Sequence, residues 1–235
     1  MKKILKSLLP QKIKLGCTFL YLFYFKNILK KYYKKIGEYT ELYPPIMSIP
    51  QYVELDEYTR LQSGTRIISS GGIVTVKKYS AIAASCTFLP GTHVPTVGLP
   101  QFLSTTHIND RQTGILIEED VWVGTNCTFL PKSCVRRGAV VGACSLVNKE
   151  VPPYSVVAGS PAKLIAVRFS LEQILEHERI LYPPEERMKR EDLELLFSTI
   201  YKDLKTIGTS EISDEDLLKL DAARKKVGMK TYENL

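Results

Sequence analysis

Apolar residues recur at every sixth position in the middle of the chain. This series runs Ile117, Val123, Phe129, Val135, Val141 and Val147. Four residues after each member stands a small or β-branched residue: Val121, Cys127, Ser133, Ala139, Ser145 and Val151. A period of six fits neither the 3.6-residue turn of an α-helix nor the alternation of a simple strand. It predicts the hexapeptide repeat of a parallel β-helix, in which three short faces form one triangular coil and the apolar residue points inward.

The same register appears upstream of an irregular segment. Val76, Ile82 and Phe88 are apolar, and Ser80, Cys86 and Thr92 follow at the small position. Residues 76–93 are therefore expected to form about one coil, and residues 52–75 one or more preceding coils. Residues 94–114 lack the repeat and contain prolines, glycines, asparagine and aspartate, which indicates a loop. A β-helix can expel such a loop without losing its stacking, and long loops in compact domains are often functional.

Three segments are expected from these patterns. Residues 41–169 form the β-helix domain, with the loop at 94–114. Residues 170–235 form a helical extension, because Pro152 and Pro153 end the ladder and Ser170 with Gln173 matches a helix cap. Further helices are expected at about 187–204 and 214–226, and residues 1–40 are expected to form a basic, apolar helical arm.

The basic charge of the chain is concentrated in this arm. The formal net charge is +7, yet residues 1–35 alone hold ten lysines and no acidic residue. The main domain is therefore not expected to bind nucleic acid. The apolar run 15–25 is too short to span a bilayer. Two interpretations stay open for the arm, peripheral contact with an anionic membrane and a helix packed on the rest of the protein.

The cysteines and histidines argue against disulfide and metal chemistry. Five cysteines in no dense pattern indicate reduced thiols, and Cys86 with Cys127 falls at the inward repeat position, where packing explains them better than nucleophilic catalysis. Zinc catalysis normally uses three protein ligands. Since only His93 and His107 fall near the coils, no metal is expected.

His93 is the strongest candidate for catalysis. It closes a regular coil where the loop departs, so it could be held rigidly at a cleft, or it could be structural. His107, inside the loop, is more readily explained as structural, and His177 as a solvated residue of the C-terminal helices. Trp122, the single tryptophan, occupies the same sixth position of its hexapeptide as His93. The two side chains could face one cleft, or Trp122 could pack against a neighbouring subunit.

Two segments resemble the hexapeptide-repeat acetyltransferases, in particular the maltose, galactoside and polysaccharide O-acetyltransferase group. They are IEEDVWVG at 117–124 and VPPYSVVAGSPAKLI at 151–165. The resemblance covers about residues 60–169 and implies a mainly β fold, a left-handed parallel β-helix. It also implies a homotrimer that uses acetyl-CoA, with His93 as general base. The positions that match the family's CoA contacts are Thr125, Ala143, Asn148, Lys149 and Lys163. Thr92 stands where many relatives have Asp or Asn, which leaves the group that orients the imidazole undefined. Cys144 and Asn148 also depart from the usual residues, at positions that concern cofactor packing.

The function expected from the residues and the resemblance is O-acetylation of a sugar or polysaccharide hydroxyl. Histidine suits the role of base, because imidazole titrates near neutral pH. Two alternatives stay open: N-acetylation of an amino sugar or a nucleotide-linked amino sugar, and a β-helix scaffold that has lost its chemistry. The expected location is the cytoplasm, with at most peripheral contact between residues 1–35 and the inner face of the cell membrane.

Overall fold

The structure, a computed structural model, describes residues 11–21, 29–68 and 72–232. The chain divides into two compact units. One consists of Met1–Pro153 and Val157–Leu164, and the other of Tyr154–Val156 and Ile165–Leu235. Each is described below by itself.

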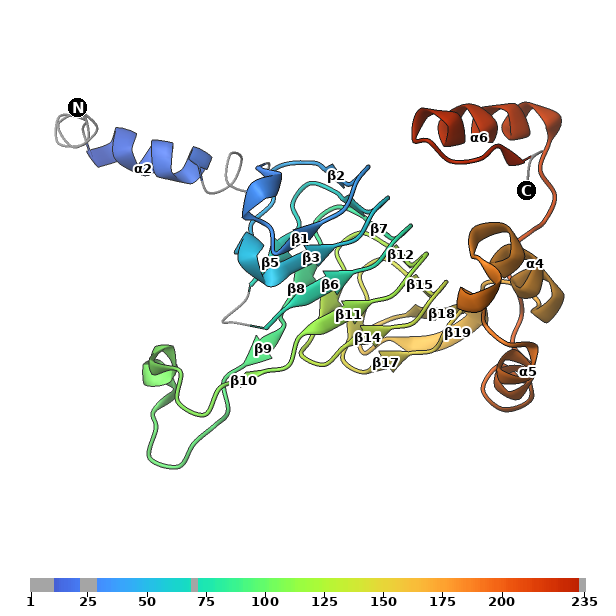
Figure 1. Cartoon of the computed structure of the whole chain (residues 1–235). Helices are drawn as coiled ribbons and strands as arrows, with labels where there is room; N and C mark the ends of the chain where they lie inside the picture. The colour runs from blue at the N-terminus through green and yellow to red at the C-terminus, as the bar shows by residue number, and fades with distance from the viewer. Residues whose placement is uncertain (1–10, 22–28, 69–71, 233–235) are drawn as a thin grey trace. The chain divides into compact units, whose positions relative to one another are not determined.

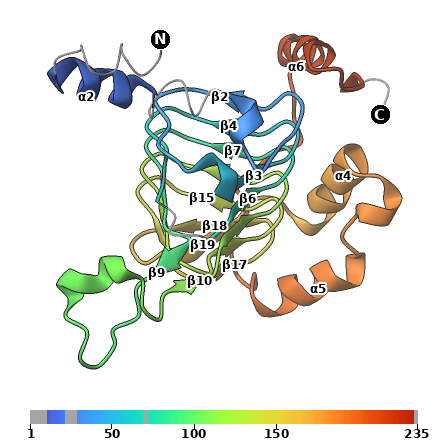
Figure 2. The same cartoon turned by 60° about the vertical axis from the view of Figure 1, so that its left-hand side comes forward.

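The first unit is a solenoid whose stacked turns form three faces of mostly parallel strands, which are visible in Figures 1 and 2. The six-stranded face holds β1 (Lys35–Ile36), β3 (Val53–Leu55), β6 (Val74–Val76), β11 (Ile115–Ile117), β14 (Cys134–Val135) and β17 (Glu150–Val151). The seven-stranded face holds β2 (Glu41–Leu42), β4 (Arg60–Leu61), β7 (Ala81–Ile82), β12 (Trp122–Val123), β15 (Val140–Val141), β18 (Ser155–Ala158) and β19 (Lys163–Val167). The residues of β18 and β19 are divided between the two units. The four-stranded face holds β5 (Arg66–Ile67), β8 (Thr87–Phe88), β13 (Thr128–Phe129) and β16 (Leu146–Val147). The predicted left-handed β-helix of hexapeptide repeats is confirmed.

The repeat explains the core. Every residue of the two series that begin at Ile117 and Val121 is at most 3% exposed. Identical positions stack between turns, as in Phe88 on Phe129, whose ring centroids lie 4.7 Å apart with planes 5° from parallel. Upstream, one position departs from the prediction: Thr92 is exposed instead of inward, because the chain leaves the coil after β8. The regular coil therefore ends at Phe88.

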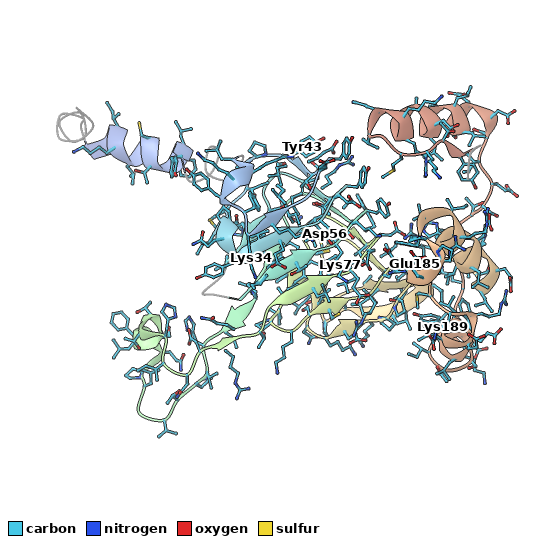
Figure 3. The ribbon with its side chains drawn as sticks, viewed as in Figure 1. Lys34, Tyr43, Asp56, Lys77, Glu185 and Lys189 are labelled. Atoms are coloured by element: carbon cyan, nitrogen blue, oxygen red, sulfur yellow. The ribbon has the colours of Figure 1, made fainter. Side chains whose placement is uncertain are left out.

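The turns between the faces are tight and carry the polar groups. At Gly124, an added Cβ would lie 2.6 Å from the backbone nitrogen of Ala143, so only glycine fits between these two turns. Buried Ser80 ties two turns together: its Oγ donates to the Glu118 carbonyl at 2.6 Å and accepts from the Val121 N–H at 3.0 Å. Ion pairs lie outside, such as Lys77 with Glu119 at 3.3 Å (Figure 3 labels Lys77).

The irregular segment is a hairpin that leaves the solenoid. It consists of β9 (Gly91–Thr92), the 3-10 helix η4 (Gln101–Thr106) and β10 (Arg111–Gln112), which pairs antiparallel with β9. Figures 1 and 2 show this hairpin projecting from the stacked turns. β6 pairs directly with β11, with Val74 opposite Ile115, so the ladder continues past the hairpin without a break.

The second unit is helical. It contains α4 (Leu171–Leu181), the 3-10 helix η5 (Pro184–Glu186), α5 (Arg190–Thr199) and α6 (Asp214–Lys226). The predicted cap is present, because the side chain of Ser170 accepts from the Gln173 N–H and that of Gln173 accepts from the Ser170 N–H. α6 has the predicted bounds, whereas α5 is shorter at both ends than the predicted 187–204. Tyr154, Ile174 and Leu193 form the core of this unit.

The N-terminal part contains α2 (Gln11–Leu20), followed by the 3-10 helices η2 (Lys30–Tyr32) and, after β2, η3 (Pro50–Tyr52). Residues 13–21 are exposed, including Leu15 and Phe19. Among the described residues, no helix combines the length and apolar character needed to cross a bilayer. The rest of the predicted arm, residues 1–10 and 22–28, lies outside the described residues. Tyr33, at the edge of the arm, is 8% exposed and belongs to the solenoid core.

Candidate active site

The neck of the hairpin brings His93 opposite Asp110. The ladder pairs Thr92 with Arg111, so the next residues, His93 and Asp110, face each other where the two strands part. The Nδ1 atom of His93 lies 2.9 Å from Oδ1 of Asp110. The Nδ1 atom of His107 lies 2.7 Å from the other carboxylate oxygen, Oδ2. One carboxylate therefore holds two imidazoles.

The burial of the three groups differs. The Asp110 side chain is 6% exposed, whereas the side chains of His93 and His107 are 45% and 57% exposed. The hydrogen bond from His107, with that from His93, lowers the pKa of the Asp110 carboxyl, although desolvation opposes the shift. Asp110 is therefore an ionised, acceptor-only group at neutral pH.

The charge of Asp110 fixes the protons of both rings. An ionised carboxylate only accepts hydrogen bonds, so the Nδ1 atoms of His93 and His107 must each carry a proton. In a neutral imidazole the other nitrogen, Nε2, then holds a free lone pair. His93 is thus oriented to accept a proton at Nε2 from a molecule beside the neck, the arrangement that a general base requires.

Asp110 is the group that the sequence left undefined. It is 17 residues from His93 and served only as one sign of a loop. The sequence offered only an indirect signal of this contact. If the two ends of a loop pair as a hairpin, the residues just inside the paired ends, here His93 and Asp110, lie opposite each other. His93, His107 and Asp110 also form the one potential metal-ligand group found within the described ranges, with ligand atoms all within 4.8 Å of one another.

Trp122 lies on another part of the solenoid. It begins β12, is 48% exposed, and pairs with Ala81 and Val140 on the seven-stranded face. The hairpin leaves between β8 on the four-stranded face and β11 on the six-stranded face. Within one chain, the six-stranded face therefore lies between the corner that carries His93 and the start of β12, where Trp122 lies.

The residues matched to CoA contacts fall mainly at two corners. Thr125 and Ala143 occupy equivalent turns between the seven- and four-stranded faces, and the N–H of Cys144 donates to the Thr125 carbonyl at 2.8 Å. Asn148 and Lys149 occupy the turn between the four- and six-stranded faces, the corner from which the hairpin leaves. All four are exposed, as is Lys163 in β19. Thus the four-stranded face has predicted CoA contacts along both edges.

The second unit holds a hollow of about 470 Å³ that contains none of the predicted site residues. His177 lines it together with Phe169 and Arg224. The expectation of a solvated His177 is wrong: its ring lies 5.1 Å from that of Phe169 and edge-on to Tyr154. Buried Glu178 was also missed, and it accepts from the Tyr154 hydroxyl at 2.6 Å.

Known proteins resemble this chain in part. No family model matches it. The Vibrio cholerae hexapeptide-repeat acetyltransferase solved with acetyl coenzyme A superposes with a TM-score of 0.54 at 22% identity, covering 60% of this chain and 75% of that one. The chain has the fold of the hexapeptide-repeat acetyltransferases.

Sequence relatives match shorter stretches of this fold. A chloramphenicol acetyltransferase of Morganella morganii is 43% identical over 75 residues, which are 32% of this chain and 36% of that protein. WbbJ of Escherichia coli K12, which carries the provisional name lipopolysaccharide biosynthesis O-acetyl transferase, is 43% identical over 55 residues, 23% of this chain and 28% of that protein. The chain spans about a third of the length of the curated relatives it matches.

Proposed function

We propose that the protein is an acetyl-CoA-dependent O-acetyltransferase that acts on a hydroxyl of a sugar or polysaccharide. The observation that carries this proposal is the His93–Asp110 pair at the hairpin neck, on a fold shared with acetyltransferases. The similarity to WbbJ favours a surface glycan as acceptor.

The proposed reaction is a direct transfer with His93 as base. Nε2 of His93 takes the proton of the acceptor hydroxyl as its oxygen attacks the carbonyl carbon of the thioester. The tetrahedral intermediate then collapses, the carbon–sulfur bond breaks, and the imidazolium returns the proton to the sulfur of the leaving CoA. Asp110 keeps the proton on Nδ1 and stabilises the transient imidazolium, the part a carboxylate plays in other acid–base pairs.

The positions of the other predicted site residues support a proposed place for acetyl-CoA and a proposed oligomer. We propose that acetyl-CoA lies along the solenoid, with Thr125 and Ala143 allowing close approach and Asn148, Lys149 and Lys163 near its polar parts. Lysines suit the negative phosphates of CoA. Because His93 and Trp122 occupy different corners of one chain, a site that uses both needs a second copy. A cytoplasmic homotrimer supplies it, with Trp122 contacting the acceptor or pantetheine of the neighbouring site.

We further propose that the N-terminal arm makes a peripheral contact with an anionic membrane. Residues 1–35 carry ten lysines and no acid, and α2 exposes Ile13, Leu15 and Phe19. Basic and apolar groups together bind anionic bilayers, at roughly 1 kcal/mol per lysine near the surface. A shortened protein that lacks residues 1–28 tests this membrane contact. It should begin at residue 29, because Tyr33 and β1 belong to the solenoid and must be kept.

An acceptor screen tests the proposed activity. The full chain is incubated with acetyl-CoA and a panel of neutral sugars, amino sugars, nucleotide-linked sugars and isolated surface glycan, and free thiol is followed. Acceptor-dependent thiol release with hydroxyl-only sugars, lost in His93→Ala, supports O-transfer. Release with amino sugars alone indicates N-acetylation instead. Absence of release with every acceptor contradicts an active transferase and favours a binding scaffold.

A further inference from the structure

We propose that His93, Asp110 and His107 form a binding site for a zinc-like divalent ion, and that the bound ion switches the general base off. The ion is not a cofactor of the reaction but a reversible inhibitor. Binding stands on the geometry alone, whereas inhibition rests on the proposed function.

The three side chains provide the donor set of a zinc site. Two imidazole nitrogens and one carboxylate oxygen are the ligands that Zn²⁺ takes at sites with an open fourth position. Calcium and magnesium prefer sites made of oxygen ligands alone. The ligand atoms all lie within 4.8 Å of one another. Ligands placed about 2.1 Å from one ion are mutually separated by less than that limit, so small shifts of side chains bring them into range.

The environment of the cluster also suits an ion. The Asp110 carboxylate is 6% exposed and lies between the two rings, so its charge is held at the centre of the cluster. Both rings are about half exposed, which leaves access for the ion and for a water as fourth ligand. The hairpin ladder fixes two of the three ligands, because His93 and Asp110 are the residues next to a paired position.

Metal binding and base catalysis exclude each other through the tautomer of His93. Without metal, Asp110 holds the proton on Nδ1 and leaves Nε2 free. A metal bound at Nδ1 requires that nitrogen to be unprotonated, so in the neutral ring the proton moves through solvent to Nε2. The number of protons on the ring does not change. Nε2 then carries hydrogen instead of a lone pair, and His93 can no longer accept the proton of the acceptor hydroxyl.

Titration calorimetry with Zn²⁺ on metal-free full chain, above pH 8, tests the binding. His107→Asn removes one ligand and should weaken Zn²⁺ binding by tenfold or more, since loss of even an outer-shell partner costs about 10–100-fold. His177→Asn is the matched control in the second unit and should bind Zn²⁺ as the wild type does. Cys17→Ser and Cys144→Ser test the two exposed thiols as competing ligands and should also bind Zn²⁺ as the wild type does. Millimolar or weaker binding by the wild type would overturn the proposal, and so would equal affinity in His107→Asn.

Inhibition is measured in chelator-buffered Zn²⁺, with each variant compared with its own metal-free rate. Zn²⁺ should suppress thiol release by the wild type, EDTA should restore it, and His107→Asn should need at least tenfold more free Zn²⁺. If Zn²⁺ binds at the cluster without reducing the rate, the switch is wrong. If no acceptor gives turnover, the proposed function fails while calorimetry still decides the metal site.

Discussion

Replacing Asp110 by asparagine separates the orientation of the base from the base itself. Asparagine keeps the size of the side chain but removes the charge, and its amide can donate as well as accept. The carboxylate now contacts Nδ1 of His93 at 2.9 Å and admits only a donor there. In Asp110→Asn both tautomers of His93 become allowed, and the imidazolium loses its anionic partner.

The size of the effect follows from the exposure of the ring. A general base contributes about 10²–10⁴-fold to turnover, so His93→Ala should lose about 10² or more. In buried catalytic triads the matching aspartate change costs about 10⁴. Here His93 is 45% exposed, so water can replace part of the contact and solvate the imidazolium. We therefore expect a loss of about 10- to 100-fold in kcat, smaller than in His93→Ala, with KM for acetyl-CoA little changed.

The assay is acceptor-dependent thiol release, with kcat and KM measured separately and folding checked by circular dichroism. Asp192→Asn makes the same chemical change at an exposed position of α5 and should leave kcat unchanged. Wild-type turnover in folded Asp110→Asn would refute the role assigned to the carboxylate. A fall in Asp110→Asn as large as that in His93→Ala would refute the partial, orienting role.

Three further changes test the solenoid and its surface. Ser80→Ala leaves the buried N–H of Val121 without its acceptor and should lower the free energy of unfolding by about 1–3 kcal/mol in urea titrations. The loss should exceed that in Ser145→Ala, because the Ser145 hydroxyl donates to the Gly142 carbonyl within its own turn. Burial would raise the pKa of Glu119, but its backbone N–H and two cationic neighbours lower it overall. Ionised Glu119 therefore stabilises the fold at pH values above the ordinary carboxyl pKa of about 4. This stabilisation is lost as the pH falls through the lowered pKa that Glu119 has in the folded state. Glu119→Gln should thus lower the free energy of unfolding at pH 7 by about 1 kcal/mol or less, with little effect near pH 2. An equal loss at both pH values would contradict this reasoning. Trp122→Ala should raise KM for acceptor or acetyl-CoA with unchanged melting temperature, since the residue is 48% exposed; a change in kcat alone would contradict the contact role.

The repeat could be predicted because it is a local constraint applied many times. Each inward position of the regular turns must accept an apolar or small residue, so a period of six is visible over a long window. The first turn was harder to find, because its six-residue series holds only two apolar members, Ile36 and Leu42, before it reaches Ser48. The contact between His93 and Asp110 depends on hairpin pairing inside an irregular segment, where no period reveals which residues face each other. Half-buried His177 was missed because its partners belong to the tertiary packing of the second unit.

The continuous ladder beneath the hairpin has an evolutionary consequence. The pairing of Val74 with Ile115 does not depend on the residues between β8 and β11. His93 and Asp110 are positioned by the pairing of β9 with β10. The tip, residues 94–106, can therefore change in length or sequence while the stack and the His93–Asp110 pair stay in place. Doubling the length of a flexible loop adds only about 0.6 kcal/mol of closure cost. The proposed base and its carboxylate partner can thus be inherited unchanged while the surface beside them diverges through the tip.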